Sequence, residues 1–165
     1  MKVAIIMGSD SDWSVMKPAV DVLRGFDIEV EVTVASAHRT PHRVEEFVKT
    51  AQEKDARVFI AAAGCAAHLA GVVASYTTCP VIGVPINAEP FKGLDSLLAT
   101  VQMPSGVPVA TMAVNGAKNA ALFAAEIFAV SDDNIKNKLK DYRAKMAAEV
   151  EEKAEKINRQ IDNQA

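Results

Sequence analysis

The segment Ser36-Ala37-His38-Arg39-Thr40-Pro41 places two side chains that are suited to chemistry next to each other. The imidazole of His38 can exchange a proton near neutral pH and can therefore act as a general acid and base. The planar guanidinium of Arg39 is suited to holding a phosphate group. A solvated loop would explain the same residues, and His42, which follows shortly after, is interpreted as a surface residue. This segment is the strongest indication of a catalytic site.

A second polar segment, Gly8-Ser9-Asp10-Ser11-Asp12, leads into an expected helix. It is neither a dinucleotide-binding glycine fingerprint nor a Walker A motif. Backbone N–H groups at a helix N-terminus attract phosphate, and the hydroxyls of Ser9 and Ser11 can add donors. Asp10 and Asp12 would repel a phosphate, so at least one must face elsewhere, and Asp12 suits a ribose diol or a helix cap. Plain capping of the helix remains the alternative to ligand binding.

The third segment, residues 61–68, is rich in small side chains. Gly64, Cys65 and Ala66 would let a ligand approach the backbone closely and would leave a tight, apolar pocket. His68 either packs against the protein or lines that pocket. A Cys65 nucleophile activated by His68 would need a third group to orient the histidine, and the sequence shows none. We therefore interpret Cys65 as an inert, pocket-lining thiol.

Short β-branched runs alternate with helical patterns, which predicts parallel strands joined by right-handed crossovers. Strands are expected at residues 3–7, 28–34, 58–62, 81–84 and 107–114, and helices at residues 11–25, from 41, 67–75, 94–101 and 117–129. Thr40 is expected as an N-cap with Pro41 as the first helical residue. The fold class is therefore α/β, a flavodoxin-like three-layer sandwich with a five-stranded parallel sheet in the order 2-1-3-4-5.

The elements place the three polar segments at one edge of this sheet. Each segment follows a strand, and a further loop, residues 87–93, follows the fourth strand. Ligands of open parallel sheets bind beyond the carboxyl ends of the strands. We therefore expect these loops to form one crevice.

In the first helix, we expect one face to be made of Trp13, Met16, Val20 and Leu23.

The last segment, residues 131–165, predicts a long amphipathic helix after a catalytic domain of residues 1–130. Ser131, Asp132 and Asp133 form a good helix start. An apolar stripe recurs every three or four residues and consists of Ile135, Leu139, Tyr142, Met146, Val150, Ala154, Ile157 and Ile161. The helix packs either on its own domain or on a neighbouring subunit. We favour the neighbour, because the other helices already cover the sheet.

The composition narrows the class of protein. The chain has 165 residues, a formal net charge of −3 and two cysteines, Cys65 and Cys79. This charge does not suggest binding to nucleic acid or to an anionic membrane, and no apolar run approaches a membrane span. The cysteines form no metal or disulfide motif, which is typical of a reducing, cytoplasmic location. With three scattered histidines, we expect no metal and no cofactor.

Taken together, residues 2–130 resemble the class I N5-carboxyaminoimidazole ribonucleotide mutases. The resemblance is carried by residues 7–12, 36–41, 66–69, 80–85, 93–98 and 101–109, in this order and spacing. It implies an isomerase of purine biosynthesis that moves a carboxyl group on a phosphorylated aminoimidazole ribotide, works as a homo-octamer and builds its sites between subunits. The related class II enzymes, which carboxylate the ribotide with CO2, usually carry lysine where Arg39 stands and an Arg-Ser-Asn-type third loop.

The resemblance also implies roles for individual residues. His38 falls on the catalytic histidine, and Ser9, Asp12 and Arg39 fall on positions that bind the ribotide. Ser36 and the loop from Gly64 through Cys65 and Ala66 to His68 fall on positions that line the site. Three residues depart from the family pattern, which commonly has glycine where Ala62 and Cys65 stand and proline where Ala70 stands. The side chain of Cys65 is expected to narrow the pocket.

Two other classes share this fold. A phospho-receiver module needs an acceptor aspartate at the end of the third strand, where this chain has Ala63-Gly64-Cys65. A flavin-carrying electron-transfer protein needs aromatic residues to stack on the cofactor, and the loops offer only Trp13, Tyr76 and Phe91. Fold alone excludes neither class.

Overall fold

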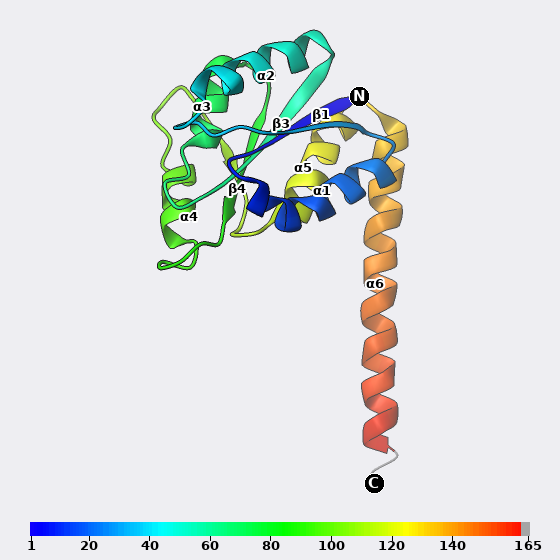
Figure 1. Cartoon of the computed structure of the whole chain (residues 1–165). Coiled ribbons are helices and arrows are strands. Elements are labelled where there is room, and N and C mark those ends of the chain that lie inside the picture. The colour runs from blue at the N-terminus through cyan, green and yellow to red at the C-terminus, as the bar shows by residue number, and fades with distance from the viewer. Residues whose placement is uncertain (163–165) are drawn as a thin grey trace. The chain divides into compact units, whose positions relative to one another are not determined.

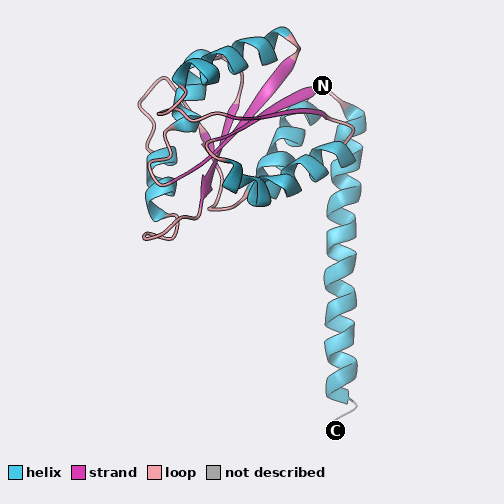
Figure 2. Cartoon of the chain, viewed as in Figure 1, coloured by secondary structure: helices cyan, strands magenta, loops and turns pink. Residues whose placement is uncertain are grey.

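The computed structural model describes residues 1–162 and contains the predicted five-stranded parallel sheet in the order β2-β1-β3-β4-β5 (Figures 1 and 2). The strands are β1 (Lys2–Met7), β2 (Glu29–Val34), β3 (Ala56–Gly64), β4 (Val81–Ile86) and β5 (Ala110–Thr111). The helices are η1 (Asp10–Asp12), α1 (Trp13–Gly25), α2 (Pro41–Glu53), α3 (Leu69–Tyr76), α4 (Leu94–Val101), α5 (Ala117–Ala129) and α6 (Asp133–Asp162). The predicted fold class and strand order are confirmed.

The central strands are apolar because both of their faces are covered. β1 pairs in parallel with β2 on one side and β3 on the other, and Ile5 lies opposite both Val32 and Ile60. Ile5 and Ile60 are fully buried, whereas Val32 lies on the edge strand and is partly exposed. Continuous apolar runs of this kind are typical of a parallel sheet between two layers of helices. The sheet therefore forms a rigid support for the loops at its carboxyl edge.

Helices lie on both faces of the sheet (Figure 1). Val44 and Val48 of α2, together with Leu69 of α3, pack in one core cluster with Phe59 of β3. Figure 1 shows α1 and α5 on the other face. Three of the four residues expected on one face of α1 are buried, namely Met16, Val20 and Leu23. The fourth residue, Trp13, is 40% exposed at the start of the helix.

The fifth strand is much shorter than predicted. Residues 107–114 were expected, but β5 contains only Ala110 and Thr111. Pro108 has no N–H to donate to the sheet, which limits the strand at its start. The chain then leaves the regular ladder, although the N–H of Met112 still donates to Gly83 O at 2.9 Å. At Asn115 the backbone turns into the left-handed region, with φ of 58°, and pairing stops.

The start of α3 differs from the prediction, and the start of α2 agrees with it in position but not in how its cap is made. α3 begins at Leu69 and not at residue 67, so His68 occupies the N-cap position in place of a position inside the helix. Thr40 is the N-cap of α2 and Pro41 its first residue, as predicted, but the Thr40 side chain does not cap the helix. Its hydroxyl accepts from the N–H of Ser36 at 2.9 Å and donates to Ser36 O at 3.2 Å. Thr40 thus closes the turn that carries His38.

The chain divides into two compact units, Met1–Ala125 and Glu126–Ala165. Residues 163–165, the end of the segment expected from 131 to 165, lie outside the described residues. In the second unit, Asp132 accepts from the N–H of Ile135 at 2.9 Å, which confirms the predicted helix start. Ile135 and Leu139 are buried, whereas the stripe further along α6 is exposed: Met146 by 51%, Val150 by 63%, Ile157 by 54% and Ile161 by 62%.

Candidate active site

One cavity of about 570 Å³ lies where the carboxyl ends of the strands meet, a volume in the range of small-molecule sites. The loops after β1, β2, β3 and β4 all contribute to its wall. The lining residues are Gly8, Ser9, Ser11, Asp12, Ser14, Val15, Ser36, Ala37, His38, Arg39, Ala63, Gly64, Cys65, Ala66, Leu69, Ile86, Asn87 and Ala88. The structure therefore brings together all of the predicted site residues except His68.

The loop after β1 forms a tight turn that is closed by its own polar groups. Ser9 and Asp12 form a capping box around η1: the Ser9 hydroxyl accepts from the N–H of Ser11, and the Ser9 N–H donates to the Asp12 carboxylate at 3.2 Å. Ser11 donates its hydroxyl to Ser9 Oγ at 2.8 Å. Ser9 and Asp12 therefore cap the helix start and also line the cavity, as does Ser11 beside them.

The two carboxylates of this turn behave differently. Asp12 is only 7% exposed, whereas Asp10 is on the surface and does not line the cavity. Burial raises the pKa of Asp12, while hydrogen bonds from Ser9 and Ser11 oppose this rise. One acidic side chain therefore points away from the cavity, as expected, and the other is held by the turn itself.

Arg39 joins the second loop to the first. Its guanidinium Nη2 donates to Gly8 O at 3.2 Å, and its backbone N–H donates to the Ser36 hydroxyl at 3.2 Å. Arg39 lines the cavity together with Ser9 and Ser11 of the first loop. A planar cation beside hydroxyls and a helix start is an arrangement that suits a phosphate group.

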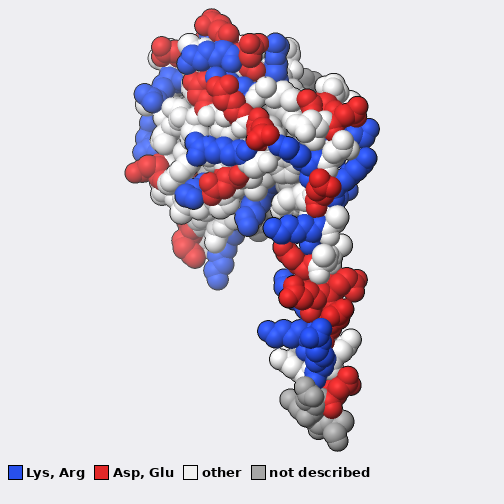
Figure 3. Space-filling view, turned by 90° about the vertical axis from the view of Figure 1, so that its right-hand side faces the viewer, with Lys and Arg blue, Asp and Glu red and all other residues white. Residues whose placement is uncertain are grey.

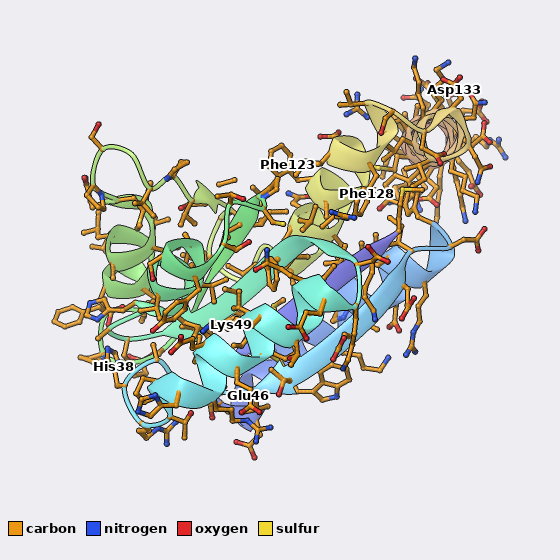
Figure 4. The ribbon with its side chains drawn as sticks, turned by 90° about the horizontal axis from the view of Figure 1, so that it is seen from above. His38, Glu46, Lys49, Phe123, Phe128 and Asp133 are labelled. Atoms are coloured by element: carbon orange, nitrogen blue, oxygen red, sulfur yellow. The ribbon has the colours of Figure 1, made fainter. Side chains whose placement is uncertain are left out.

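His38 and His68 meet at the rim of the cavity. Nε2 of His38 and Nδ1 of His68 are 2.9 Å apart, and the rings meet edge to face with their centroids separated by 5.0 Å. Figure 4 shows His38 in the loop before α2. His68 does not line the main cavity but borders a neighbouring groove of about 530 Å³ between α3 and α4. His68 is therefore linked to the cavity by its hydrogen bond to His38.

The loop after β3 carries small side chains up to the cavity, as predicted. Gly64, Cys65 and Ala66 line it, and the thiol of Cys65 is exposed. Cys65 has a left-handed backbone with φ of 52°, which is a conformation that favours glycine. Because Nδ1 of His68 is engaged with His38, the arrangement offers no support for a base acting on Cys65.

The structure adds lining residues that were not named as site residues from the sequence, among them Ala37 and Leu69, and it places Asn87 and Ala88 of the expected fourth loop in the lining. Asn87 and Ala88 follow β4, and the N–H of Asn87 donates to the Asn115 side chain at 2.9 Å. Their position after a strand was the available signal. Apolar residues such as Leu69 carried no signal, because their residue type is the same as that of core residues.

The described residues give no sign of a metal centre or of a helix that could span a membrane. Within residues 1–162, no group of three or more histidine, cysteine, aspartate or glutamate side chains could hold a metal ion. In the same range, no helix combines the length and apolar character needed to span a membrane. Figure 3 shows lysine and arginine interspersed with aspartate and glutamate on the face in view.

Known proteins are similar to this chain over most of its length. The family model described as AIR carboxylase matches residues 2–149. The chain is 53% identical to the N5-carboxyaminoimidazole ribonucleotide mutase of Thermotoga maritima, covering 94% of this chain and 91% of that protein. For the protein of the same name from Pyrococcus horikoshii, the identity is 54%, with 94% and 88% covered.

A solved structure also has the same fold as this chain. The crystal structure of Treponema denticola PurE superposes with a TM-score of 0.86 at 32% sequence identity and covers 94% of this chain and 97% of that one. The region matched by the family model, residues 2–149, includes β1 to β5 and every loop of the cavity. The chain belongs to the AIR carboxylase family.

Proposed function

We propose that this chain is an isomerase of purine biosynthesis that converts N5-carboxyaminoimidazole ribonucleotide to 4-carboxyaminoimidazole ribonucleotide. The observation that carries the proposal is the single cavity in which His38 and Arg39 meet the Ser9 turn. This cavity combines an acid–base group with a site suited to phosphate. Relatives that share about half of the sequence are named for this reaction.

The ribotide is held by the polar end of the cavity. Its phosphate binds to the guanidinium of Arg39, with donors from the hydroxyl of Ser9 and the turn before α1. The buried carboxylate of Asp12 accepts from the ribose hydroxyls. Ser36, together with Gly64, Cys65 and Ala66, lines the space for the imidazole ring. The neutral, small residues of the third loop leave this space apolar.

The chemistry follows from the contrast between the two ends of the cavity. A carbamate carboxylate that enters an apolar pocket loses its hydration, which favours release of CO2. The exocyclic nitrogen then takes a proton, C4 of the ring attacks the CO2, and C4 gives up its proton. His38 donates the first proton and accepts the second, so that the enzyme ends the cycle unchanged. No step requires a metal or a cofactor.

Direct carboxylation of the ribotide by CO2 is the second candidate reaction in this family. Arg39 and the Ala63-Gly64-Cys65-Ala66 loop favour the mutase, because class II enzymes usually carry lysine and an Arg-Ser-Asn-type loop at these positions. A flavin carrier is disfavoured as well, since none of Trp13, Tyr76 and Phe91 belongs to the lining of the cavity. The end of β3 has no aspartate that could serve as a phosphoacceptor.

The variant His38→Asn tests the role of His38. It keeps a polar side chain but cannot exchange a proton near neutral pH. Turnover of the carbamate ribotide, followed by the absorbance of the product, should fall about 10²-fold or more, while calorimetry shows unchanged binding of an unreactive analogue. His42→Asn is the matched control, because His42 lies on the surface of α2, and it should behave as wild type. A His38→Asn enzyme with wild-type turnover would remove His38 from the mechanism.

The working form in this proposal is a homo-octamer with sites between subunits. Residues 1–130 form the catalytic domain, and α6, which follows it, packs on a neighbouring subunit. The exposed apolar residues of α6, and Leu94, Leu98 and Val101 of α4, which are 47–57% exposed, support an assembly that covers them. Light scattering should give eight times the protomer mass of 17.6 kDa, whereas a stable monomer at micromolar concentration contradicts the proposal.

The enzyme acts in the cytoplasm and binds neither nucleic acid nor a membrane. Two free thiols, the exposed Cys65 and the half-buried Cys79, are consistent with a reducing compartment. The formal net charge of −3 offers no attractive field for a polyanion, and the face shown in Figure 3 carries mixed charge. Cell fractionation that recovers the protein with the membranes would contradict this placement.

A further inference from the structure

The hydrogen bond between His38 and His68 joins two loops that are far apart in the sequence. His38 belongs to the turn after β2, and His68 directly precedes α3. The nitrogens that meet are Nε2 of His38 and Nδ1 of His68, at 2.9 Å. Only one of the two can carry the hydrogen in this contact, so the contact selects a tautomer for both rings.

We infer that His68 is a positioning residue whose Nδ1 accepts a hydrogen bond from the Nε2–H of His38, so that Nδ1 of His38 is the atom that exchanges the proton with the substrate. This inference rests on the proposed function for its catalytic consequence. The tautomer itself is a property of the free protein and can be tested separately.

The direction of the hydrogen bond follows from the proton balance of the cycle. If Nε2 of His38 donates to His68, its Nδ1 is free to give a proton to the exocyclic nitrogen and to take one back from C4. The ring then alternates between imidazolium and neutral imidazole, and Nε2 keeps its hydrogen throughout. If His68 donated instead, Nε2 would be blocked as an acceptor, and a neutral His38 would carry its only proton on Nδ1. Giving that proton away would create an imidazolate, which is not accessible near neutral pH.

The surroundings of His68 suit a support and not a second catalyst. The main cavity includes His38 in its lining but not His68, which borders the groove formed with Gly71, Val72, Ser75, Leu98, Ala99, Gln102 and Met103. The backbone of His68 is held on both sides: its N–H donates to Ala66 O at 2.8 Å, and its carbonyl accepts from Val72 at 3.0 Å. The imidazole is therefore carried by a turn anchored to α3, and it acts on the substrate only through His38.

Two substitutions at position 68 separate this role from simple packing. His68→Leu fills a similar volume but cannot accept a hydrogen bond. His68→Asn places an amide oxygen close to the position of Nδ1 and preserves the acceptor. We expect His68→Leu to lower kcat about 10-fold or more with KM within about 2-fold of wild type, because ring orientation is lost while ribotide contacts remain. His68→Asn should keep most of the wild-type kcat, because its amide oxygen can still accept the hydrogen bond from His38.

The tautomer of His38 provides a readout that does not depend on activity. The chain contains three histidines, so His42→Gln leaves only the pair in an NMR spectrum of protein labelled with 15N-histidine. Above the pH at which the rings become neutral, His38 should carry its hydrogen on Nε2, and His68→Leu should abolish this preference. His42→Gln alone should leave turnover unchanged, since His42 lies on the surface of α2.

The outcomes separate the two proposals. Wild-type kcat in His68→Leu, equal losses in His68→Leu and His68→Asn, or a neutral His38 protonated on Nδ1 would each overturn the positioning role. If the wild-type protein leaves the carbamate ribotide unconverted, the proposed function fails, but the NMR experiment still decides the tautomer. If His68→Leu does not fold, the kcat of His68→Asn and the spectrum of the His42→Gln protein decide the matter.

Discussion

Replacing Cys65 by glycine should stabilise the protein without impairing it. The φ of Cys65 is 52°, in the left-handed region, where a residue with a Cβ is strained by about 1–2 kcal/mol. Glycine removes this strain but costs about 0.5–1 kcal/mol of additional backbone entropy. Because the Cys65 side chain is exposed, little apolar burial is lost. We therefore expect a net stabilisation of about 0.5–1 kcal/mol.

This gain should appear as a rise in Tm of about 1–4 °C for a chain of this size. Thermal unfolding should be measured at a fixed protein concentration, since any assembly makes Tm depend on concentration. Turnover should stay the same or increase, because the thiol lines the cavity but takes no part in the proposed chemistry.

Cys65→Ala is the matched control, because alanine removes the thiol but keeps the Cβ. It should leave the unfolding free energy within about 0.5 kcal/mol of wild type. An equal rise in Tm for both variants would show that the thiol, and not the backbone conformation, is the source of instability. A loss of turnover by several orders of magnitude in both variants would give Cys65 a chemical role and would refute the reasoning.

Three further predictions concern other parts of the site and the sheet. Arg39→Ala should raise KM for the ribotide more than it lowers kcat, because it removes binding that is equal in the ground and transition states; a collapsed kcat with unchanged KM would contradict this. Gly83→Ala should destabilise the protein by about 1–3 kcal/mol in urea unfolding, since a Cβ at this position would lie 2.4 Å from Thr100 Cγ2, and an unchanged midpoint would refute the predicted clash. Burial raises the pKa of Asp12 above its ordinary value of 3.8, so the folded protein binds this proton more tightly than the unfolded chain. The contribution of Asp12 to stability should therefore be full below pH 3.8 and decline as the pH rises through the folded pKa, and Asp12→Asn should remove this part of the pH dependence of urea unfolding; an identical pH profile for the variant would contradict the assignment.

The fold could be predicted because its signals are local. Val3 to Met7 and Val58 to Ala62 are apolar runs that each follow a basic residue, and both form buried central strands. The loops that follow them lie at the carboxyl edge of any parallel sheet, so a crevice there followed from the strand order alone. The length of β5 could not be predicted, because it depends on how Pro108 and the turn at Asn115 interrupt pairing with β4.

The details of the site depend on contacts between distant residues. The hydrogen bond between His38 and His68 spans 30 positions, and its geometry arises from the packing of two separate turns. Similarly, Thr40 is the N-cap that its residue type predicts, but its hydroxyl closes the turn with Ser36 and does not cap the helix. A sequence pattern predicts which residues reach the cavity, whereas the tertiary structure determines which of their atoms meet.

The most direct test of the proposed function is a comparison of two substrates with the wild-type enzyme. The protein is incubated either with the carbamate ribotide alone or with the decarboxylated ribotide plus bicarbonate, and the absorbance of the 4-carboxy product is followed after subtraction of the uncatalysed reaction. The mutase predicts rapid formation of product from the carbamate without added bicarbonate, and far slower formation from the ribotide plus bicarbonate. Product formed only from the ribotide and bicarbonate would contradict the mutase and identify a direct carboxylase.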